Sequence, residues 1–112
     1  MSDVLEQLAT TLAARKQADP ERSYVASLHH KGLNKILEKV GEEATEVILA
    51  AKDTESGGDR NAVIGEVADL WFHSMVMLSH LDLDIKDVIR CLGDRFDVSG
   101  LDEKAARDAR GN

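Results

Sequence analysis

Two carboxylates in an otherwise apolar segment constrain the possible folds of this chain more than any other feature of its sequence. From Ala62 to Leu81 there are twenty residues without lysine or arginine, and only Glu66 and Asp69 are acidic. A helix that is apolar nearly all round is typically buried, and buried carboxylates are tolerated when they are paired or bound to metal. The segment has no cation of its own, so a divalent metal ion is the simplest candidate for the missing charge.

A second run of carboxylates precedes this segment. Glu42, Glu43 and Glu46 form the pattern E-E-x-x-E, and Glu66 with Asp69 forms E-x-x-D after nineteen intervening residues. Taken alone, the first run is more typical of a solvated helix face. The second run reverses that interpretation, because a solvated surface does not explain carboxylates in an apolar helix.

Composition favours one helical domain over residues 1–112. One proline and 43% hydrophobic residues describe an ordered globular protein, and the 4% aromatic content disfavours a β-rich fold. The pattern predicts an all-α bundle of four to five helices, with breaks at Pro20 and in the polar stretch 54–60. The expected helices are about 3–17, 33–53, 61–81, 85–96 and a short tail helix at 101–110, and a short piece at 24–30 is a further helical candidate.

Charge and cysteine content exclude several classes of protein. The net charge of −7 argues against nucleic acid as a partner, because phosphate backbones are bound by clustered basic surfaces. The single cysteine, Cys91, rules out an internal disulfide and is expected to be a small buried residue. The acidic N-terminus does not resemble a secretion signal, and we expect no segment that spans a membrane. These features predict a cytoplasmic protein.

Helical geometry brings the carboxylates of each run together. Positions three or four apart lie on one helix face, so Glu43 and Glu46 point the same way, and so do Glu66 and Asp69. If the two long helices pack antiparallel, as their short connection favours, the two rows face each other. Hard oxygen ligands in this number suit Mg²⁺ or Mn²⁺, and such ions bind phosphate oxygens. The sequence therefore predicts a metal site that acts on a di- or triphosphate.

Lysines accompany the first run. Lys39 lies one turn before Glu43 and is the main candidate for a phosphate contact, with Lys35 and Lys52 as further candidates. His73 is expected to be a packed, hydrogen-bonded histidine rather than a metal ligand. The large side chains near it are expected in the core or in a dimer contact: Trp71, Phe72, Met75 and Met77.

The spacing of the two acidic runs resembles the all-α nucleoside triphosphate pyrophosphatases, the MazG-type superfamily. Within it, the chain resembles the phosphoribosyl-ATP pyrophosphatase family over nearly its whole length. The central block of that family is similar to SYVASLHHKGLNKILEKVGEEATEVILAAKD, its second block to EVADLWFHSMVML and its tail to SGLDEKAAR. The family pattern predicts glycine at position 97, and this chain has Asp97 there instead.

The resemblance implies a reaction and a set of residues. The reaction is Mg²⁺-dependent hydrolysis of phosphoribosyl-ATP to phosphoribosyl-AMP and pyrophosphate, the second step of histidine biosynthesis. Glu43, Glu46, Glu66 and Asp69 match the metal ligands of the family, and Glu42 matches an accessory acid that lies either behind these ligands or near the attacking water. The resemblance also implies a homodimer, and the apolar circumference of 62–81 agrees with this. It further implies that phosphoribosyl-AMP cyclohydrolase is the functional neighbour.

Two alternatives stay open at this point. A house-cleaning hydrolase of non-standard nucleoside triphosphates uses the same acids and differs in the residues that hold base and sugar. A non-enzymatic helical interaction module binds metal for structure alone and releases no pyrophosphate. A ferritin-like redox site is disfavoured, because the chain has no Glu-x-x-His motif.

Overall fold

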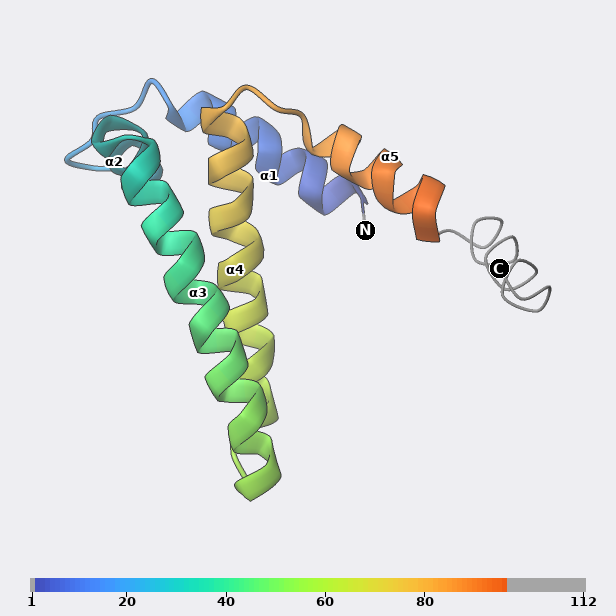
Figure 1. Ribbon diagram of the computed structural model, residues 1–112. Helices are drawn as coiled ribbons and strands as arrows, with labels where there is room; N and C mark the ends of the chain where they lie inside the picture. Colours follow the sequence, from blue (N-terminus) through green and yellow to red (C-terminus); the bar gives the residue numbers. More distant parts are fainter. Residues whose placement is uncertain (1, 97–112) are drawn as a thin grey trace.

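The computed structural model describes residues 2–96, and every regular element in this range is helical (Figure 1). This confirms the all-α class and places the helices within a few residues of the expected bounds. The expected tail helix at 101–110 and the departure at Asp97 lie outside the described residues. The elements are α1 (Ser2–Arg15), α2 (Tyr24–Lys31), α3 (Leu33–Asp53), the 3-10 turn η1 (Thr54–Ser56), α4 (Arg60–His80) and α5 (Ile85–Phe96).

The two longest helices, α3 and α4, form an antiparallel hairpin and lie side by side (Figure 1). The turn between them requires glycine at two positions. Gly57 has a φ of 86°, a left-handed conformation that glycine adopts without steric cost. At Gly58 a Cβ atom would lie 2.8 Å from the main-chain oxygen of Asp53. The tight turn brings the middle of α3 against the middle of α4, where the two acidic runs lie.

The hydrophobic core lies at one end of this hairpin, where α1, α2 and α5 meet it (Figure 1). All five helices contribute buried apolar side chains to it, so the start of α3 and the end of α4 are held firmly. The other end of the hairpin projects from the core. The buried core residues are Leu12, Val25, Leu28, Ile36, Met75, Val76 and Ile85.

The first half of α4 is largely exposed in the single chain, which differs from the expectation of a helix buried all round. Its buried residues, His73, Met75 and Val76, all lie in its second half. Ile64 and Trp71 are 68% and 53% exposed. Residues 2–96 of one chain therefore offer too few neighbours to bury this helix.

By length and composition α4 also qualifies as a membrane-spanning helix, contrary to the expectation from the sequence. Core helices of soluble proteins pass the same test. Glu66 and Asp69 lie in the middle of α4, where charged groups are costly in a lipid interior. The composition of α4 is therefore that of a helix covered by protein.

The outer face of α5 is open as well. Ile85 is its one buried residue, and Leu92 and Phe96 are 53% and 52% exposed. Cys91 is exposed, so the prediction of a buried cysteine is wrong for the single chain. The reason is that α5 packs mainly on α1, and no other helix within residues 2–96 covers its outer face.

A pair of stacked histidines joins α2 to the end of α4. The rings of His29 and His80 are within 18° of parallel, with centroids 5.3 Å apart. Their Nδ1 atoms are 3.1 Å apart, so one ring donates a hydrogen bond and the other accepts it. Burial lowers the pKa of His29, and the nearby His80 and Lys16 lower it further.

We expect His29 to make the protein less stable in mild acid. Its folded pKa lies below its unfolded value of about 6.5, so the unfolded chain binds more protons and the free energy of unfolding falls as pH drops below that value. The variant His29→Phe keeps a ring against His80 but does not titrate. Urea unfolding at about pH 7.5 and about pH 5.5 should show a smaller loss of stability in the variant. An equal loss in both proteins would contradict this role for His29.

Candidate metal site

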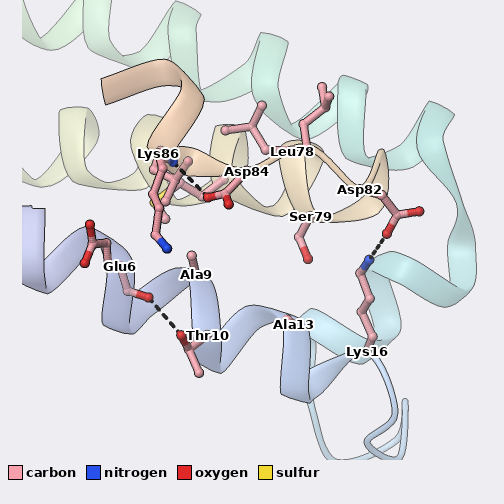
Figure 2. Close-up of a pocket in the computed structure, with 13 residues that line it drawn as sticks. Glu6, Ala9, Thr10, Ala13, Lys16, Leu78, Ser79, Asp82, Asp84 and Lys86 are labelled. Atoms are coloured by element: carbon pink, nitrogen blue, oxygen red, sulfur yellow. Dashed lines mark hydrogen bonds and ion pairs between the residues drawn. The ribbon is translucent and has the colours of Figure 1, made fainter. Parts of the chain in front are cut away.

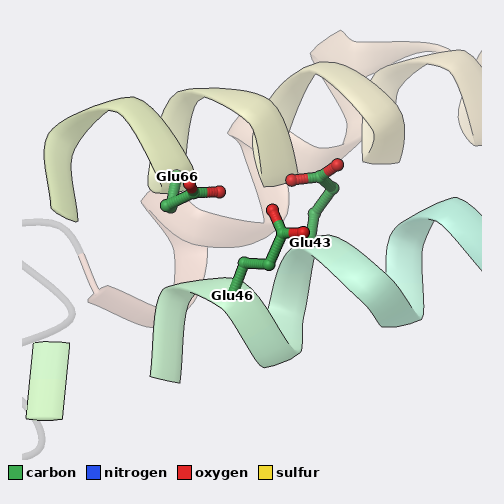
Figure 3. Close-up of side chains that lie close together, drawn as sticks. All are labelled: Glu43, Glu46 and Glu66. Atoms are coloured by element: carbon green, nitrogen blue, oxygen red, sulfur yellow. The ribbon is translucent and has the colours of Figure 1, made fainter. Parts of the chain in front are cut away.

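Three carboxylates from the two long helices meet in the middle of the hairpin. Glu43 and Glu46 project from α3 and Glu66 projects from α4, with oxygens that all lie within 4.8 Å of one another (Figure 3). Glu43 is buried, with 7% of its surface exposed. Glu66 is half-buried and Glu46 is exposed. The antiparallel packing of α3 and α4 thus brings the two acidic runs together in one acidic cluster, Glu43, Glu46 and Glu66.

Two oxygens of the acidic cluster have no hydrogen-bond partner among the described residues. They are Oε2 of Glu43 and Oε2 of Glu66, and both are buried. A buried carboxylate oxygen without a donor is unfavourable, and a bound cation would compensate for it. Since the cluster offers oxygen ligands alone, it suits a hard divalent cation.

The cluster also changes the ionisation of its members. Burial raises the pKa of Glu43, and its hydrogen bond with Glu46 and the charge of Glu46 raise it further. The pKa of Glu66 is raised first by a hydrogen bond with Glu46 and then by burial. The charge of Asp69 raises the pKa of both, whereas His73 lowers that of Glu43. Uptake of a proton or a metal ion by the cluster is therefore favoured.

Asp69 lies one turn after Glu66 on α4, at the edge of the acidic cluster. Its charge reaches Glu43 and Glu66, yet it is not one of the three residues whose oxygens meet within 4.8 Å. Its side chain is exposed in the single chain, which corrects the expectation of a buried carboxylate. The cause is the uncovered face of α4. Its main-chain oxygen accepts a hydrogen bond of 2.7 Å from Nδ1 of His73.

Lys39 and Glu42 form a charged pair beside the cluster. The ammonium of Lys39 lies 2.9 Å from Oε2 of Glu42 and 3.8 Å from Oε1 of Glu43. The hydrogen bond lowers the pKa of Glu42 and raises the pKa of Lys39. The pKa of Glu42 is thus lowered where that of Glu43 is raised, and Lys39 places a cation next to the cluster.

The two other lysines make ion pairs elsewhere on α3. Lys35 pairs with Glu38 at 3.6 Å, and its charge also lowers the pKa of Glu42. Lys52 pairs with Glu55 in η1, and its side chain is 73% exposed. Of the three candidate lysines, Lys39 is the one that the fold places against the cluster.

Tyr24 belongs to this region, although the sequence pattern did not single it out. Its hydroxyl oxygen lies 2.8 Å from Nε2 of His73. The prediction that His73 is a packed, hydrogen-bonded histidine is confirmed, because it is buried and both ring nitrogens have partners. A tyrosine at the start of a short helix looks like any surface aromatic, and only the packing of α2 against α4 brings it here. The one available signal was its place in the block SYVASLHHKG, ahead of the first acidic run.

A model of the phosphoribosyl-ATP pyrophosphohydrolase family matches residues 5–96, which include the acidic cluster and Lys39. The chain belongs to this family. Relatives from Burkholderia vietnamiensis, Burkholderia multivorans and Burkholderia cenocepacia are each 56% identical over 108 residues, which is 96% of this chain and 89% of each relative. Each of the three is called phosphoribosyl-ATP pyrophosphatase. Membership in a family of pyrophosphohydrolases agrees with a cluster whose ligands suit a phosphate-binding metal.

Proposed function

We propose that this protein hydrolyses phosphoribosyl-ATP between its α- and β-phosphates and releases phosphoribosyl-AMP and pyrophosphate. The observation that carries the proposal is the acidic cluster with its two buried oxygens that lack a donor. The family match and the names of the Burkholderia relatives support the choice of substrate. The protein then acts as a single cytoplasmic domain in the second step of histidine biosynthesis, with phosphoribosyl-AMP cyclohydrolase consuming its product.

Four carboxylates would hold the metal in this reaction: Glu43, Glu46, Glu66 and Asp69. Mg²⁺ fits this oxygen set, and Mn²⁺ is an alternative. When bound, the ion polarises the phosphoryl oxygens and favours deprotonation of water. The carboxylates would hold the ion in the middle of the hairpin, and the position of the ion would in turn fix the place of the triphosphate.

Two charged side chains beside the cluster complete the proposed reaction. Pairing with Lys39 lowers the pKa of Glu42, which keeps Glu42 ionised but makes it a weaker base, so its carboxylate is suited to orient the attacking water by accepting a hydrogen bond from it. Lys39 carries three donors on its ammonium, and Glu42 takes one of them. The others are suited to oxygens of the departing pyrophosphate, where negative charge develops.

The substrate is tested by comparing phosphoribosyl-ATP with a panel of canonical and non-standard nucleoside triphosphates. Pyrophosphate release by the purified chain is measured with Mg²⁺ for each compound. We expect kcat/KM for phosphoribosyl-ATP to exceed that of the others by about 100-fold or more, as for a site that recognises polar groups of its substrate. Preference for another triphosphate would instead support the house-cleaning alternative. Metal-dependent folding without pyrophosphate release would support the non-enzymatic one.

We further propose that the protein works as a homodimer. Large apolar side chains are exposed on both long helices, among them Ile48 and Leu49 on α3 and Ile64 and Trp71 on α4. An apolar groove between α1, α4 and α5 continues this surface past Trp71, and Leu5, Met77, Ile89 and Leu92 line it. Exposed apolar surface of this extent is typical of a protein–protein contact.

Sedimentation equilibrium at micromolar concentration is expected to give twice the chain mass of 12.3 kDa. Trp71→Asp places a charge in the exposed apolar surface and should shift the protein towards monomers. Gln17→Asp, in the connection between α1 and α2, is the matched control and should leave the mass unchanged. A folded, active monomer of the wild-type chain under these conditions would contradict the dimer.

A further inference from the structure

A chain of two hydrogen bonds connects the metal-site helix to Tyr24. His73 is 6% exposed. Its Nδ1 lies 2.7 Å from the main-chain oxygen of Asp69, and its Nε2 lies 2.8 Å from the hydroxyl of Tyr24. A carbonyl oxygen only accepts hydrogen bonds, so Nδ1 carries the hydrogen. In the neutral ring Nε2 is then the acceptor, and the hydroxyl of Tyr24 donates to it.

This arrangement decides what the hydroxyl of Tyr24 is able to bind. Its single hydrogen is used by His73, so its oxygen is left as an acceptor for further hydrogen bonds. Ionised phosphate oxygens are acceptors too, and they do not suit such a group. Sugar hydroxyls and the N–H groups of a base are donors. The hydroxyl of Tyr24 is therefore suited to the nucleoside part of a nucleotide.

Tyr24 lies within the electrostatic reach of the metal site. Burial raises the pKa of its hydroxyl, the charge of Lys39 lowers it, and the charges of Glu43, Glu42 and Asp69 raise it. The charges of the metal site therefore act on the hydroxyl, and Lys39 opposes the three carboxylates. Tyr24, the first residue of α2, is thus connected to the metal site by these charges and by its contact with His73.

The ring of Tyr24 is held in place and yet remains open to a ligand. It stacks on Phe72 with centroids 6.3 Å apart and meets the edge of His73 at 5.7 Å. The residue is nevertheless 51% exposed. This exposed part of the side chain is accessible to a ligand.

We propose that Tyr24 binds the nucleoside part of the substrate, by accepting a hydrogen bond from a ribose hydroxyl or a base N–H, and that His73 is the positioning residue that orients it. The inference rests on the proposed function, because it places the triphosphate on the acidic cluster and Lys39. The two parts of the nucleotide are then recognised separately. Lys39 contacts the phosphates, and Tyr24 contacts the nucleoside.

The two reaction products allow this division to be measured, since each contains one part of the substrate. We expect Tyr24→Phe to raise the Kd of phosphoribosyl-AMP about 10-fold in calorimetry, and to change that of pyrophosphate with Mg²⁺ by less than about two-fold. Lys39→Met should give the opposite pattern. In turnover of phosphoribosyl-ATP, Tyr24→Phe should affect KM more than kcat, as expected for a contact present before the transition state.

Two substitutions of His73 distinguish its role in orienting Tyr24 from its role in the packing of the core. In His73→Asn, the amide nitrogen lies near the position that Nδ1 has in the histidine, so the donor to the main-chain oxygen of Asp69 is retained. The asparagine offers no acceptor to the hydroxyl of Tyr24. In His73→Gln, the side-chain carbonyl oxygen lies near the position that Nε2 has in the histidine, so an acceptor for the hydroxyl of Tyr24 is retained. We expect His73→Asn to bind phosphoribosyl-AMP as weakly as Tyr24→Phe does, and His73→Gln to restore most of the affinity. Thermal unfolding of both variants shows whether each is folded.

The outcomes distinguish this inference from the proposed function. If Tyr24→Phe lowers Tm but leaves the Kd of phosphoribosyl-AMP unchanged, the Tyr24–His73 pair is structural and the inference is wrong. Equal losses of affinity in His73→Asn and His73→Gln would overturn the positioning role. If the wild-type chain neither binds phosphoribosyl-AMP nor cleaves phosphoribosyl-ATP, the proposed function fails and this inference fails with it.

Discussion

Asp69→Ala is expected to lower Mg²⁺-dependent turnover by about 10³-fold or more while leaving the metal-free protein as stable as the wild type, or more stable. The loss of activity follows from removing one metal ligand. The gain in stability follows from removing a charge that raises the pKa of both Glu43 and Glu66. Most substitutions destabilise a protein, so this combination of effects is specific to a site with repelling charges.

The pH dependence of this effect has a definite sign. A carboxyl group whose folded pKa is raised binds protons more tightly in the folded state, so stability is lost as pH rises above its unfolded pKa of about 4.3. Without Asp69 the pKa of Glu43 and that of Glu66 move back towards that value. The stabilisation by Asp69→Ala should therefore be absent at about pH 4 and present at about pH 7 in the metal-free protein.

The measurements are pyrophosphate release at saturating Mg²⁺ and urea unfolding in the presence of a chelator. Asp87→Ala is the matched control, because Asp87 is an exposed carboxylate on α5 that pairs with Arg90. It should lose little activity and little stability. Near-normal turnover of Asp69→Ala would contradict the assignment of Asp69 to the metal site.

The helices and the meeting of the acidic runs were predictable from local features of the sequence. Apolar residues at helical spacing, the break at Pro20 and the glycines at 57–58 set the element bounds. The antiparallel hairpin then follows from the short connection, and it brings Glu43 close to Glu66. These inferences need only the geometry of one helix and one turn.

Features that depend on more distant packing were not predictable in this way. Asp69 and Cys91 were expected to be buried, but their exposure depends on which faces of α4 and α5 find a neighbour. Tyr24 reaches His73 only because α2 crosses the start of the hairpin, and no periodicity encodes that crossing. The choice between the candidate lysines likewise required ion-pair geometry, which separates Lys39 from Lys52.

Lys39→Met is the second substitution with a large expected effect. It keeps the aliphatic stem and removes the charge, so folding should survive. Exposed ion pairs contribute about 0–1 kcal/mol, and the loss of the pair with Glu42 should change stability by no more than that. If the ammonium stabilises charge on the departing pyrophosphate, kcat should fall together with kcat/KM, by about 100-fold for one lost charge-stabilising donor.

Lys35→Met is the matched comparison, because it distinguishes the loss of a phosphate contact from the loss of a helix ion pair. Lys35 and Lys39 each pair with a glutamate three residues later on α3, and they differ in that Lys39 also lies 3.8 Å from a carboxylate oxygen of Glu43. Loss of a helix ion pair should therefore affect the stability of both variants alike, whereas loss of a phosphate contact should affect the kcat of Lys39→Met alone. Unaltered kinetics in Lys39→Met would mean that Lys39 only neutralises Glu42 and Glu43. A larger loss in Lys35→Met would assign the phosphate contact to Lys35, and no loss in either would leave Lys52 as the remaining candidate.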